Sequence, residues 1–168
     1  MNVLLINQSN GVQPNQNPPL GILYLASCAR LAGHAVRVHD QRAPESANRF
    51  PSPEEIREFD PGLIGISVYT FGIQSSIRFV EETRRSFPRV KIVLGGHHAT
   101  ALPERTMADI PGADFLAYGE GEDTLVELLA ALDGQGDVSG IRGILHRIDG
   151  GIVRNRPRDR LRNLDERP

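Results

Sequence analysis

Cysteine and lysine are the scarcest reactive residues of this 168-residue sequence. The single cysteine, Cys28, excludes an internal disulfide and a cluster of cysteine ligands, and it suits a reducing compartment. The only lysine, Lys91, falls inside an apolar run, so the chain has no Gly-Lys-Ser/Thr phosphate loop. No apolar run approaches the roughly 18 residues of a membrane span, and the N-terminus lacks a signal-peptide pattern. We therefore expect a soluble, cytoplasmic protein without a membrane partner.

An excess of charge of either sign is also lacking. The net charge is −2, so bulk electrostatics favour neither nucleic acid nor an anionic membrane as a partner. Hydrophobic residues make up 39% of the chain and charged residues 24%, which is typical of a soluble globular protein. A chain of this length buries about two-thirds of its unfolded surface, so it needs no covalent cross-links. The composition predicts one domain of ordinary size.

Short apolar runs alternate with helical patterns through most of the chain. The predicted strands are NVLLIN (2–7), AVRVHD (35–40), GLIGISVY (62–69), RVKIVLGG (89–96) and ADFLAYG (113–119). The predicted helices cover about residues 18–33, 53–59, 72–87, 101–109 and 122–133. Five strands that are each followed by a helix imply a parallel sheet with helices on both faces. We predict a three-layer, doubly wound α/β fold whose five-stranded sheet has the flavodoxin-like order 2-1-3-4-5.

Three of these helices carry residues at helical spacing. The sets are Leu20, Tyr24, Ser27, Cys28 and Leu31 in the first, Ile73, Ile77, Val80 and Phe87 in the third, and Leu125, Leu128, Leu129 and Leu132 in the last. The helix at 53–59 begins with Pro53 after a predicted Ser52 cap.

The pattern changes after residue 140. The sequence GILHRIDGGIVRN (143–155) predicts two short strands around an Asp-Gly-Gly turn, which is a β-hairpin signal. The last stretch, RPRDRLRNLDERP (156–168), is rich in arginine and poor in apolar residues. Such a stretch is typical of an RNA-binding patch or of a solvated linker, and its interspersed acids favour the linker.

Ligands of open parallel sheets bind beyond the carboxyl ends of the strands, where the strand order reverses. In this chain four loops form that edge, at residues 7–17, 67–72, 95–99 and 119–123. They combine small or amide-bearing residues with exposed backbone donors and carry no concentrated positive charge. The loop NQSNGVQPN (7–15) has neither the glycine pattern of a dinucleotide site nor the Ser/Thr-rich run of flavodoxin. Asn7 and Tyr118 stand where a phospho-receiver domain needs an acid and a lysine, so all these occupants are excluded.

The adjacent pair His97 and His98 leaves two interpretations open. Neighbouring histidines can bind a hydrolytic zinc ion, but such sites generally need three protein ligands and an open position. The sequence places no third ligand beside them, since His34, His39 and His146 are scattered. We favour a structural or supporting role over direct ligation of a metal.

The ligand type that remains is large, flat and mostly neutral, with many amide groups and a buried tail. Gly95 and Gly96 at a strand end let a planar body lie on the backbone. Ser67, Thr70 and free N–H groups at helix starts can pair with amides and a phosphate.

Five segments resemble, in order, the cobalamin (B12)-binding domain that precedes the barrel of radical S-adenosylmethionine (SAM) enzymes. They are PPLGILYLASCARLAGHAVRVHD (18–40), GLIGISVYTF (62–71), VLGGHHATALPE (93–104), AYGEGEDTL (117–125) and GILHRIDGGIVRN with NLDERP (143–155 and 163–168). The likeness covers nearly the whole chain. It implies a cobalamin-binding domain at 1–140, a β-hairpin extension at 141–156, and a linker at 157–168 into a radical SAM domain.

The resemblance also implies which residues contact cobalamin. Ser67, Tyr69 and Thr70 would contact the nucleotide tail, and Gly95 and Gly96 would let the tail and the corrin ring approach closely. His97 and His98 would line the lower face or rim of the corrin, and Leu20 and Gly21 would lie near the lower face. Gly119, Glu120, Gly121 and Glu122 would contact the corrin amides or shape the floor of the last helix. Simpler interpretations stay open for several positions. The two neighbouring glycines could form only a tight turn, and the acids at 120–122 could only complement a helix dipole. Leu20 could be an ordinary core residue.

One departure concerns the cobalt ligand. The methionine synthase and mutase branch carries Asp-x-His-x-x-Gly after the first strand, whereas QSNGVQPNQNPPLG (8–21) has no histidine. The resemblance to the radical SAM branch therefore implies base-off cobalamin without a histidine from this loop. Cobalt that lacks a strong lower donor is expected to be open to other chemistry.

The leading hypothesis is the cofactor domain of a B12-dependent radical SAM methyltransferase, in which cobalamin carries the methyl group and this chain has no catalytic residue. SAM and a [4Fe–4S] cluster would bind only in the downstream domain, and the substrate of the parent enzyme would be a small molecule or a lipid. The alternatives are a cyclase of the Mg-protoporphyrin monomethyl ester type, a stand-alone B12 carrier or sensor, a docking element without cofactor, and a metal hydrolase at His97 and His98. No nucleic-acid partner is expected.

Overall fold

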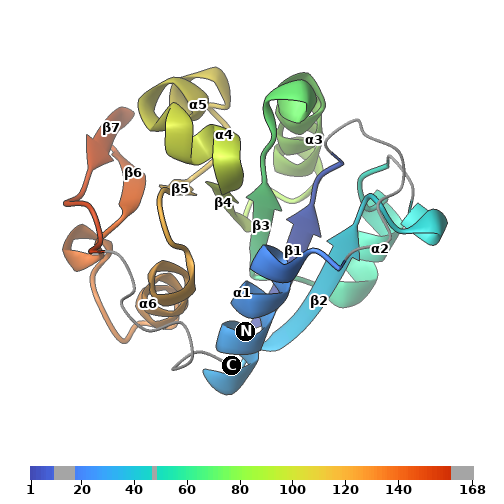
Figure 1. Cartoon of the computed structure of the whole chain (residues 1–168), viewed down its shortest axis with the longest axis horizontal. Coiled ribbons are helices and arrows are strands. Elements are labelled where there is room, and N and C mark those ends of the chain that lie inside the picture. The colour runs from blue at the N-terminus through green and yellow to red at the C-terminus, as the bar shows by residue number, and fades with distance from the viewer. Residues whose placement is uncertain (10–17, 47–48, 160–168) are drawn as a thin grey trace.

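The computed structural model describes residues 1–9, 18–46 and 49–159 of the chain, which form alternating strands and helices (Figure 1). The strands are β1 (Asn2–Asn7), β2 (Ala35–Asp40), β3 (Leu63–Ser67), β4 (Lys91–Gly95), β5 (Phe115–Ala117), β6 (Ile144–Ile148) and β7 (Gly151–Arg154). The helices are α1 (Leu20–Leu31), α2 (Pro53–Phe59), α3 (Ile73–Ser86), α4 (Gly96–Ala101), α5 (Pro103–Asp109) and α6 (Glu122–Leu132).

All described strands belong to one sheet, in the order β2-β1-β3-β4-β5-β6-β7. Strands β1 to β5 are mutually parallel, which confirms the predicted order 2-1-3-4-5. The predicted hairpin is also confirmed, and it continues the main sheet because β6 pairs antiparallel with β5. Its two-residue turn places Asp149 and Gly150 at φ angles of 49° and 80°, the left-handed geometry that Asp-Gly favours in hairpins.

The sheet is covered on both faces, as the continuous apolar runs predict. On one face, Ile64 and Ile66 of β3 belong to a core that includes residues of α2, α3, α4 and α5. On the other face, Val3 and Leu5 of β1 belong to a core shared with α1 and α6. The helices therefore form a layer on each side, and the predicted inner faces of α3 and α6 are confirmed.

The buried face of α1 differs from the prediction. Cys28 of the predicted set is buried, as are Ile22 and Ala26, whereas Leu20, Tyr24 and Leu31 are 63%, 43% and 75% exposed. The expectation that Leu20 is a core residue is therefore wrong. Since α1 has apolar residues on more than one side, helical spacing alone does not tell which stripe faces the sheet.

The segment after β4 also differs from the prediction. The expected loop at 95–99 and single helix at 101–109 are two short helices, α4 and α5, separated at Leu102. Pro103 lacks a backbone N–H and is favoured as the first residue of a helix, so it starts α5 instead of continuing α4. His97 and His98 therefore lie in the first turn of α4.

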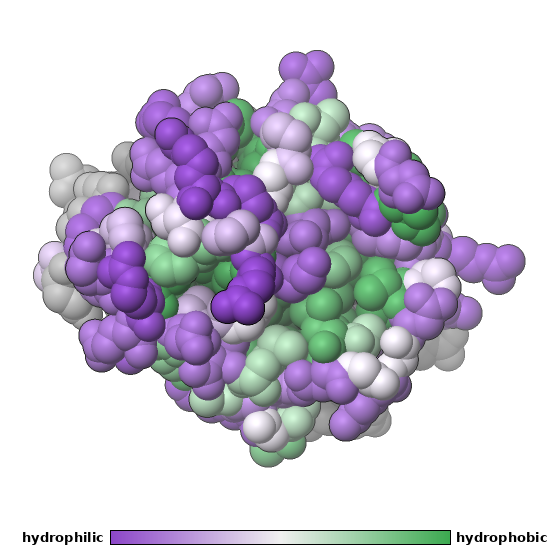
Figure 2. All heavy atoms as spheres, turned by 180° about the vertical axis from the view of Figure 1, so that it is seen from behind, coloured by the Kyte–Doolittle hydropathy of each residue, from purple (hydrophilic) through white to green (hydrophobic). Residues whose placement is uncertain are grey.

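The surface has few large apolar side chains. Seen from behind, the molecule is mostly hydrophilic, and apolar side chains show in hollows between polar ones (Figure 2). Phe71, between β3 and α3, is the most exposed large apolar residue of those described, at 88%. Within the described ranges, no helix has the length and apolar character needed to cross a lipid bilayer.

Candidate functional site

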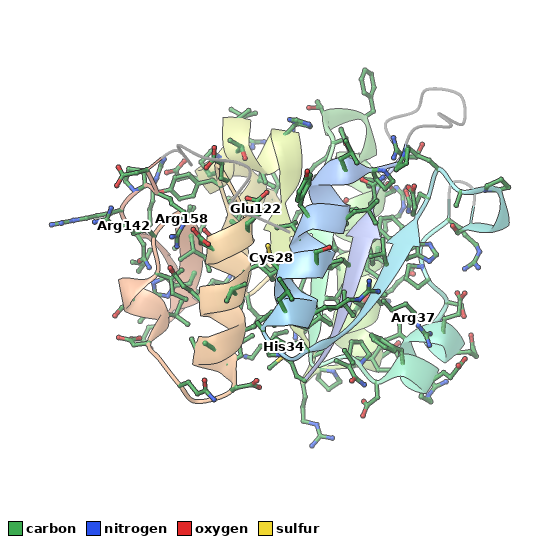
Figure 3. The ribbon with its side chains drawn as sticks, turned by 60° about the horizontal axis from the view of Figure 1, so that its bottom comes forward. Cys28, His34, Arg37, Glu122, Arg142 and Arg158 are labelled. Atoms are coloured by element: carbon green, nitrogen blue, oxygen red, sulfur yellow. The ribbon has the colours of Figure 1, made fainter. Side chains whose placement is uncertain are left out.

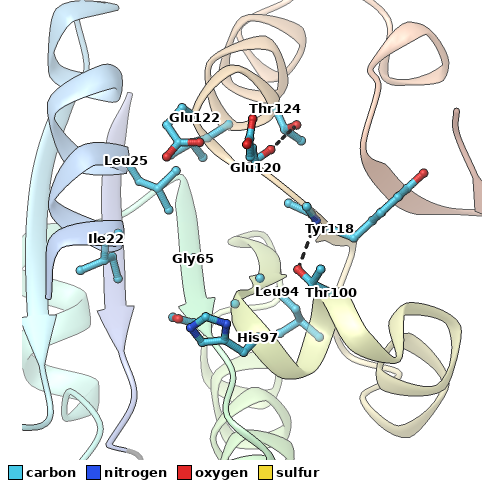
Figure 4. A pocket seen from close by; sticks show the side chains of 18 of the residues that line it. Ile22, Leu25, Gly65, Leu94, His97, Thr100, Tyr118, Glu120, Glu122 and Thr124 are labelled. Atoms are coloured by element: carbon cyan, nitrogen blue, oxygen red, sulfur yellow. Dashed lines mark hydrogen bonds between the residues drawn. The ribbon is translucent and has the colours of Figure 1, made fainter. Parts of the chain in front are cut away.

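A cavity of about 930 Å³ opens at the carboxyl edge of the sheet (Figure 4). It lies between the sheet face that α1 and α6 cover and the segments that follow β3, β4 and β5. The sequence predicts a ligand at this edge, because the strand order reverses between β1 and β3. The volume falls in the range of small-molecule sites, roughly 300–1,000 Å³.

The floor of the cavity is the middle of the sheet. Leu5, Gly65 and Val93 are paired neighbours on β1, β3 and β4, and all three line the cavity. A Cβ atom at Gly65 would stand 2.8 Å from Leu5 Cδ2 and 3.5 Å from Val93 Cγ1. A side chain here would therefore collide with Leu5, so glycine lets Leu5 and Val93 pack low over β3, as glycine inside a strand often does where another group approaches closely.

Helices α1 and α6 supply apolar walls. Ile22 and Leu25 line the cavity from α1, and Leu125 and Leu128 line it from α6. A Cβ atom at Gly121 would lie 3.2 Å from Leu25 Cδ2, so the start of α6 lies close to the Leu25 side chain of α1. An apolar slot with these walls suits a flat, uncharged part of a ligand.

Gly95 and Gly96 have different roles. Gly96 has a φ angle of 89°, and a Cβ atom there would lie 2.7 Å from Ser67 Oγ and 3.0 Å from Val68 N. Glycine is therefore required at this position for two reasons: the φ angle is positive, and the chain after β3 passes too close for a side chain. Gly95 has an extended backbone that any residue can adopt, and a Cβ atom there would meet nothing closer than 3.9 Å. The absence of a side chain at Gly95 therefore serves to keep the cavity open.

The two histidines of α4 have separate surroundings. His97 is exposed and lines the cavity beside Tyr69, with the ring centroids 5.7 Å apart. His98 is buried outside the cavity lining, and its Nδ1 is hydrogen-bonded to Thr70 Oγ1 at 3.0 Å. In the part of the chain that the structure describes, no three His, Cys, Asp or Glu residues gather as a metal site.

The start of α6 supplies a polar wall. Glu120 and Glu122 line the cavity, and Oε2 of Glu122 is buried with no hydrogen-bond partner among the described residues. Thr100 Oγ1 accepts a hydrogen bond from the backbone N–H of Gly119 at 3.1 Å, which joins α4 to the loop before α6. Figure 4 shows Glu122 on the same side of the cavity as Leu25. A buried acceptor without a partner is costly, so a ligand amide that donates to it would be stabilised.

The ends of β1 and β2 form a polar corner. Asn7 Nδ2 donates to Asp40 Oδ1 at 2.8 Å, and Arg42 Nε pairs with the same oxygen at 3.4 Å. Asn7 and Arg42 line the cavity, and the Arg42 side chain is only 12% exposed. Most of the predicted loop at 7–17 lies outside the described residues.

All the predicted cofactor-binding residues line the cavity except Thr70 and His98. Sequence reasoning missed the sheet floor, the helix walls, Arg42 and residues 157–159. Gly65 was an available signal for the floor, since a glycine inside an apolar strand marks a close approach. Residues 157–159 fall in the predicted linker, and no local pattern distinguishes them from its other charged residues.

Comparison with known proteins identifies relatives. The family model described as "B12 binding domain" matches residues 11–129. An uncharacterized methyltransferase of Pyrococcus horikoshii is 34% identical over 151 residues, which cover 90% of this chain and 32% of that protein. The anaerobic magnesium-protoporphyrin IX monomethyl ester cyclase of Synechocystis is 30% identical over 173 aligned residues, which cover 98% of this chain and 34% of the cyclase. The chain therefore spans about a third of the length of these curated relatives.

Solved structures show the same architecture. TsrM from Kitasatospora setae, a radical SAM methyltransferase solved with cobalamin and a [4Fe–4S] cluster, matches with a TM-score of 0.74 at 25% identity, over 92% of this chain and 30% of TsrM. OxsB, a cobalamin-dependent SAM radical enzyme, matches with a TM-score of 0.76 over 94% of this chain and 22% of OxsB. The identity to OxsB is 19%, so this match concerns the fold alone. The chain belongs to the family of B12-binding domains, and it is related to cobalamin-dependent radical SAM methyltransferases and to anaerobic magnesium-protoporphyrin cyclases.

Proposed function

We propose that this chain binds cobalamin with the corrin ring against the glycine-lined rim and the nucleotide tail in the slot above the sheet. One observation carries the proposal: the floor at Gly65 and the open strand end at Gly95 leave bare main chain between apolar walls. A corrin is large and flat, and most of its side chains end in amides. Such a ligand needs close contact with backbone together with a few polar partners, and Glu122 Oε2 is a suitable partner.

Each predicted residue has a place in this proposal. Ser67 and Tyr69 would contact the tail, Gly95 and Gly96 the tail and the ring, His97, Leu20 and Gly21 the lower face or rim, and Gly119, Glu120, Gly121 and Glu122 the corrin amides. We give Thr70 and His98 a supporting role, because their hydrogen bond holds the segment after β3 against α4 without reaching the cavity.

We propose that cobalamin binds in the base-off form. The segment 8–21 contains no histidine, so it lacks the cobalt ligand that the methionine synthase and mutase branch carries after the first strand. A slot above the sheet also gives the released nucleotide tail an apolar place to lie. The Co(II) EPR spectrum of the bound protein tests this, because an axial nitrogen ligand adds superhyperfine splitting to the cobalt lines and base-off binding without a histidine ligand does not.

We propose that the chain is the cofactor domain of a larger radical SAM methyltransferase. Bound cobalamin supplies a cobalt ion that can carry a methyl group, and the residues of this chain bind and orient it. The P. horikoshii relative and TsrM are both named as methyltransferases, which supports this proposal. The chain spans only about a third of the length of each, as one domain of a larger protein would. In this proposal residues 1–140 bind the cofactor, 141–156 form the hairpin extension, and 157–168 lead to a domain that binds SAM and a [4Fe–4S] cluster. Its substrate would be a small molecule or a lipid.

A cyclase is the second candidate, because the Synechocystis cyclase matches 98% of the chain. Incubation of the full-length protein with SAM and candidate substrates distinguishes the two. Transfer of a labelled methyl group to substrate supports the methyltransferase. Ring closure without methyl transfer supports the cyclase, and no SAM cleavage supports a stand-alone B12 carrier.

Titration of the full-length protein with hydroxocobalamin, followed by visible absorption, tests the binding proposal. Gly95→Leu should weaken binding about tenfold or more, since overfilling a packed site costs about 1–3 kcal/mol. This position is a better probe than Gly96, where Gly96→Leu would also strain the backbone.

Gly140→Leu is the matched control, because this substitution adds the same side chain at a position outside the cavity. No atom lies within 4 Å of the Cβ position at Gly140, so the new side chain has room. It should bind as the wild type does. Absence of binding by the wild-type protein would overturn the proposed function, and equal binding by Gly95→Leu would overturn the placement of the ligand.

A further inference from the structure

After β7 the chain returns to the edge of the cavity. Residues 155–159, here called the strap, run towards the start of α6, and 157–159 line the cavity. Nδ2 of Asn155 donates to two carbonyl oxygens in the loop before β6, at 2.7 Å each. The N–H of Gly143 donates to the carbonyl oxygen of Arg156 at 2.8 Å. These hydrogen bonds fix the course of the strap along the cavity wall.

Arg158 joins the strap to α6. Its Nε donates to Thr124 Oγ1 at 3.1 Å, and its Nη2 donates to Glu127 Oε2 at 2.5 Å and to the carbonyl oxygen of Arg142 at 3.3 Å. Its Nη1 lies 3.9 Å from Asp123 Oδ2. The side chain is only 14% exposed, so the guanidinium satisfies several groups at once in a partly dry setting. Figure 3 shows Arg158 and Arg142 together at the corner beside α6.

Thr124 connects this contact to the cavity. It is fully buried, and its hydroxyl faces the carbonyl oxygens of Arg142 and Glu120 at 3.1 and 3.4 Å. Thr124 and Glu120 both line the cavity, and Figure 4 shows them on one wall. Loss of the Arg158 guanidinium would leave the Thr124 hydroxyl with one partner fewer beside the loop 119–121, which bounds the cavity.

We propose that Arg158 is a positioning residue for the cofactor: it holds the first turns of α6, supports the loop before α6 through Thr124, and so links cofactor affinity to the course of the strap. The inference rests on the proposed function, cobalamin binding. If ordering of the strap raises the affinity for a ligand by some factor, thermodynamic linkage requires that binding of the ligand favour the ordered strap by the same factor. Ligand binding in the cavity is therefore coupled to the order of residues 155–159 through this arginine.

The experiment compares hydroxocobalamin affinity in variants of the full-length protein. Arg158→Gln should weaken binding roughly tenfold, because Thr124 loses a partner and supports the loop 119–121 less firmly, while the cavity lining keeps its shape elsewhere. Arg158→Lys keeps the charge but not the forked donor geometry, so its affinity for hydroxocobalamin should fall between those of the wild type and Arg158→Gln.

Arg147→Gln is the matched control. Arg147 is also partly buried, and its guanidinium donates to the carbonyl oxygens of Ala113 and Met107, but it does not line the cavity. This variant should lose stability and keep its dissociation constant within about twofold. Equal losses of affinity in the two glutamine variants would mean that Arg158 acts only through global stability.

Hydrogen exchange supplies a second readout. In the ligand-free protein, Arg158→Gln should speed exchange at residues 119–124, and Arg147→Gln should not. In the wild type, hydroxocobalamin should slow exchange at 155–159. Unchanged affinity and unchanged exchange in Arg158→Gln would overturn the inference. Absence of cobalamin binding by the wild type would overturn the proposed function instead, and exchange in the ligand-free protein would then decide whether Arg158 orders the loop.

Discussion

At the scale of single residues, Gly65 decides how deep the cavity is. Because it has no side chain, Leu5 and Val93 can pack low over β3, and the cavity above them stays open to a ligand group. Gly65→Val would collide with the Leu5 side chain and push it up into the cavity. We expect cobalamin to bind at least about tenfold more weakly, whereas cobinamide, which lacks the nucleotide tail, should change little. Parallel titrations with the two corrinoids measure the difference.

Ile64→Val is the control for this substitution, since Ile64 is the preceding residue and faces the opposite core. It should cost about 0.5–1.5 kcal/mol of stability and leave both affinities unchanged. Equal weakening of cobalamin and cobinamide by Gly65→Val would show that the tail does not enter the slot.

At the same scale, the glycine pair shows what sequence can and cannot predict. The pattern at 95–96 indicates a backbone close to a ligand, and both residues do lie at the cavity. The pattern does not predict that Gly96 needs glycine for its positive φ angle, whereas Gly95 needs it only to keep the cavity open. This difference depends on where the chain after β3 passes. The role of Arg158 depends in the same way on contacts with residues more than 30 positions away.

At the scale of elements, α2 has the most complete local stabilisation. Ser52 and Glu55 form a capping box, and Glu55 also pairs with Arg49. The Arg49 guanidinium, followed by the backbone N–H of Ser52, lowers the pKa of Glu55 to about 2. A lowered pKa stabilises the folded state above pH 4.5, and this stabilisation is lost as the pH falls towards 2.

Glu55→Gln should therefore reduce the loss of stability between pH 4.5 and about 2, relative to the wild type. At pH 7 the variant should be less stable by less than about 1 kcal/mol, because the pair is exposed and screened by solvent. Ser52→Ala should cost about 1 kcal/mol at pH 7. Urea denaturation across this pH range measures both, and an unchanged acid dependence in Glu55→Gln would contradict the assignment.

Elements with strong local signals were predictable, and those set by tertiary contacts were not. The Ser52 cap with Pro53 fixed the start of α2, and the Asp149-Gly150 turn fixed the hairpin. The exposed side of α1 could not be predicted, because its partner surface includes α6, almost 100 residues later. The attachment of β6 to the edge of the parallel sheet likewise depends on pairing with β5, which no local pattern encodes.

At the scale of the whole molecule, binding and folding are coupled through the sheet edge. The cavity is lined from β1, β3, β4, β5, α1, α4, α6 and the strap, so a ligand there contacts segments throughout the chain. Hydroxocobalamin at 100 times its dissociation constant should raise the free energy of unfolding by about 2.7 kcal/mol. For a chain of this size that corresponds to a melting temperature higher by roughly 5–10 °C. Thermal denaturation at several cobalamin concentrations measures the shift.

Flavin mononucleotide is the informative comparison, because it binds at the same edge of flavodoxin-like sheets. The loop after β1 lacks the Ser/Thr-rich run that holds its phosphate, so flavin mononucleotide should leave the melting temperature unchanged. A shift with flavin mononucleotide and none with hydroxocobalamin would mean that this edge binds a nucleotide through main-chain donors. The apolar slot above Gly65 predicts the opposite, since cobalamin has a long nucleotide tail that can extend from the rim towards the floor.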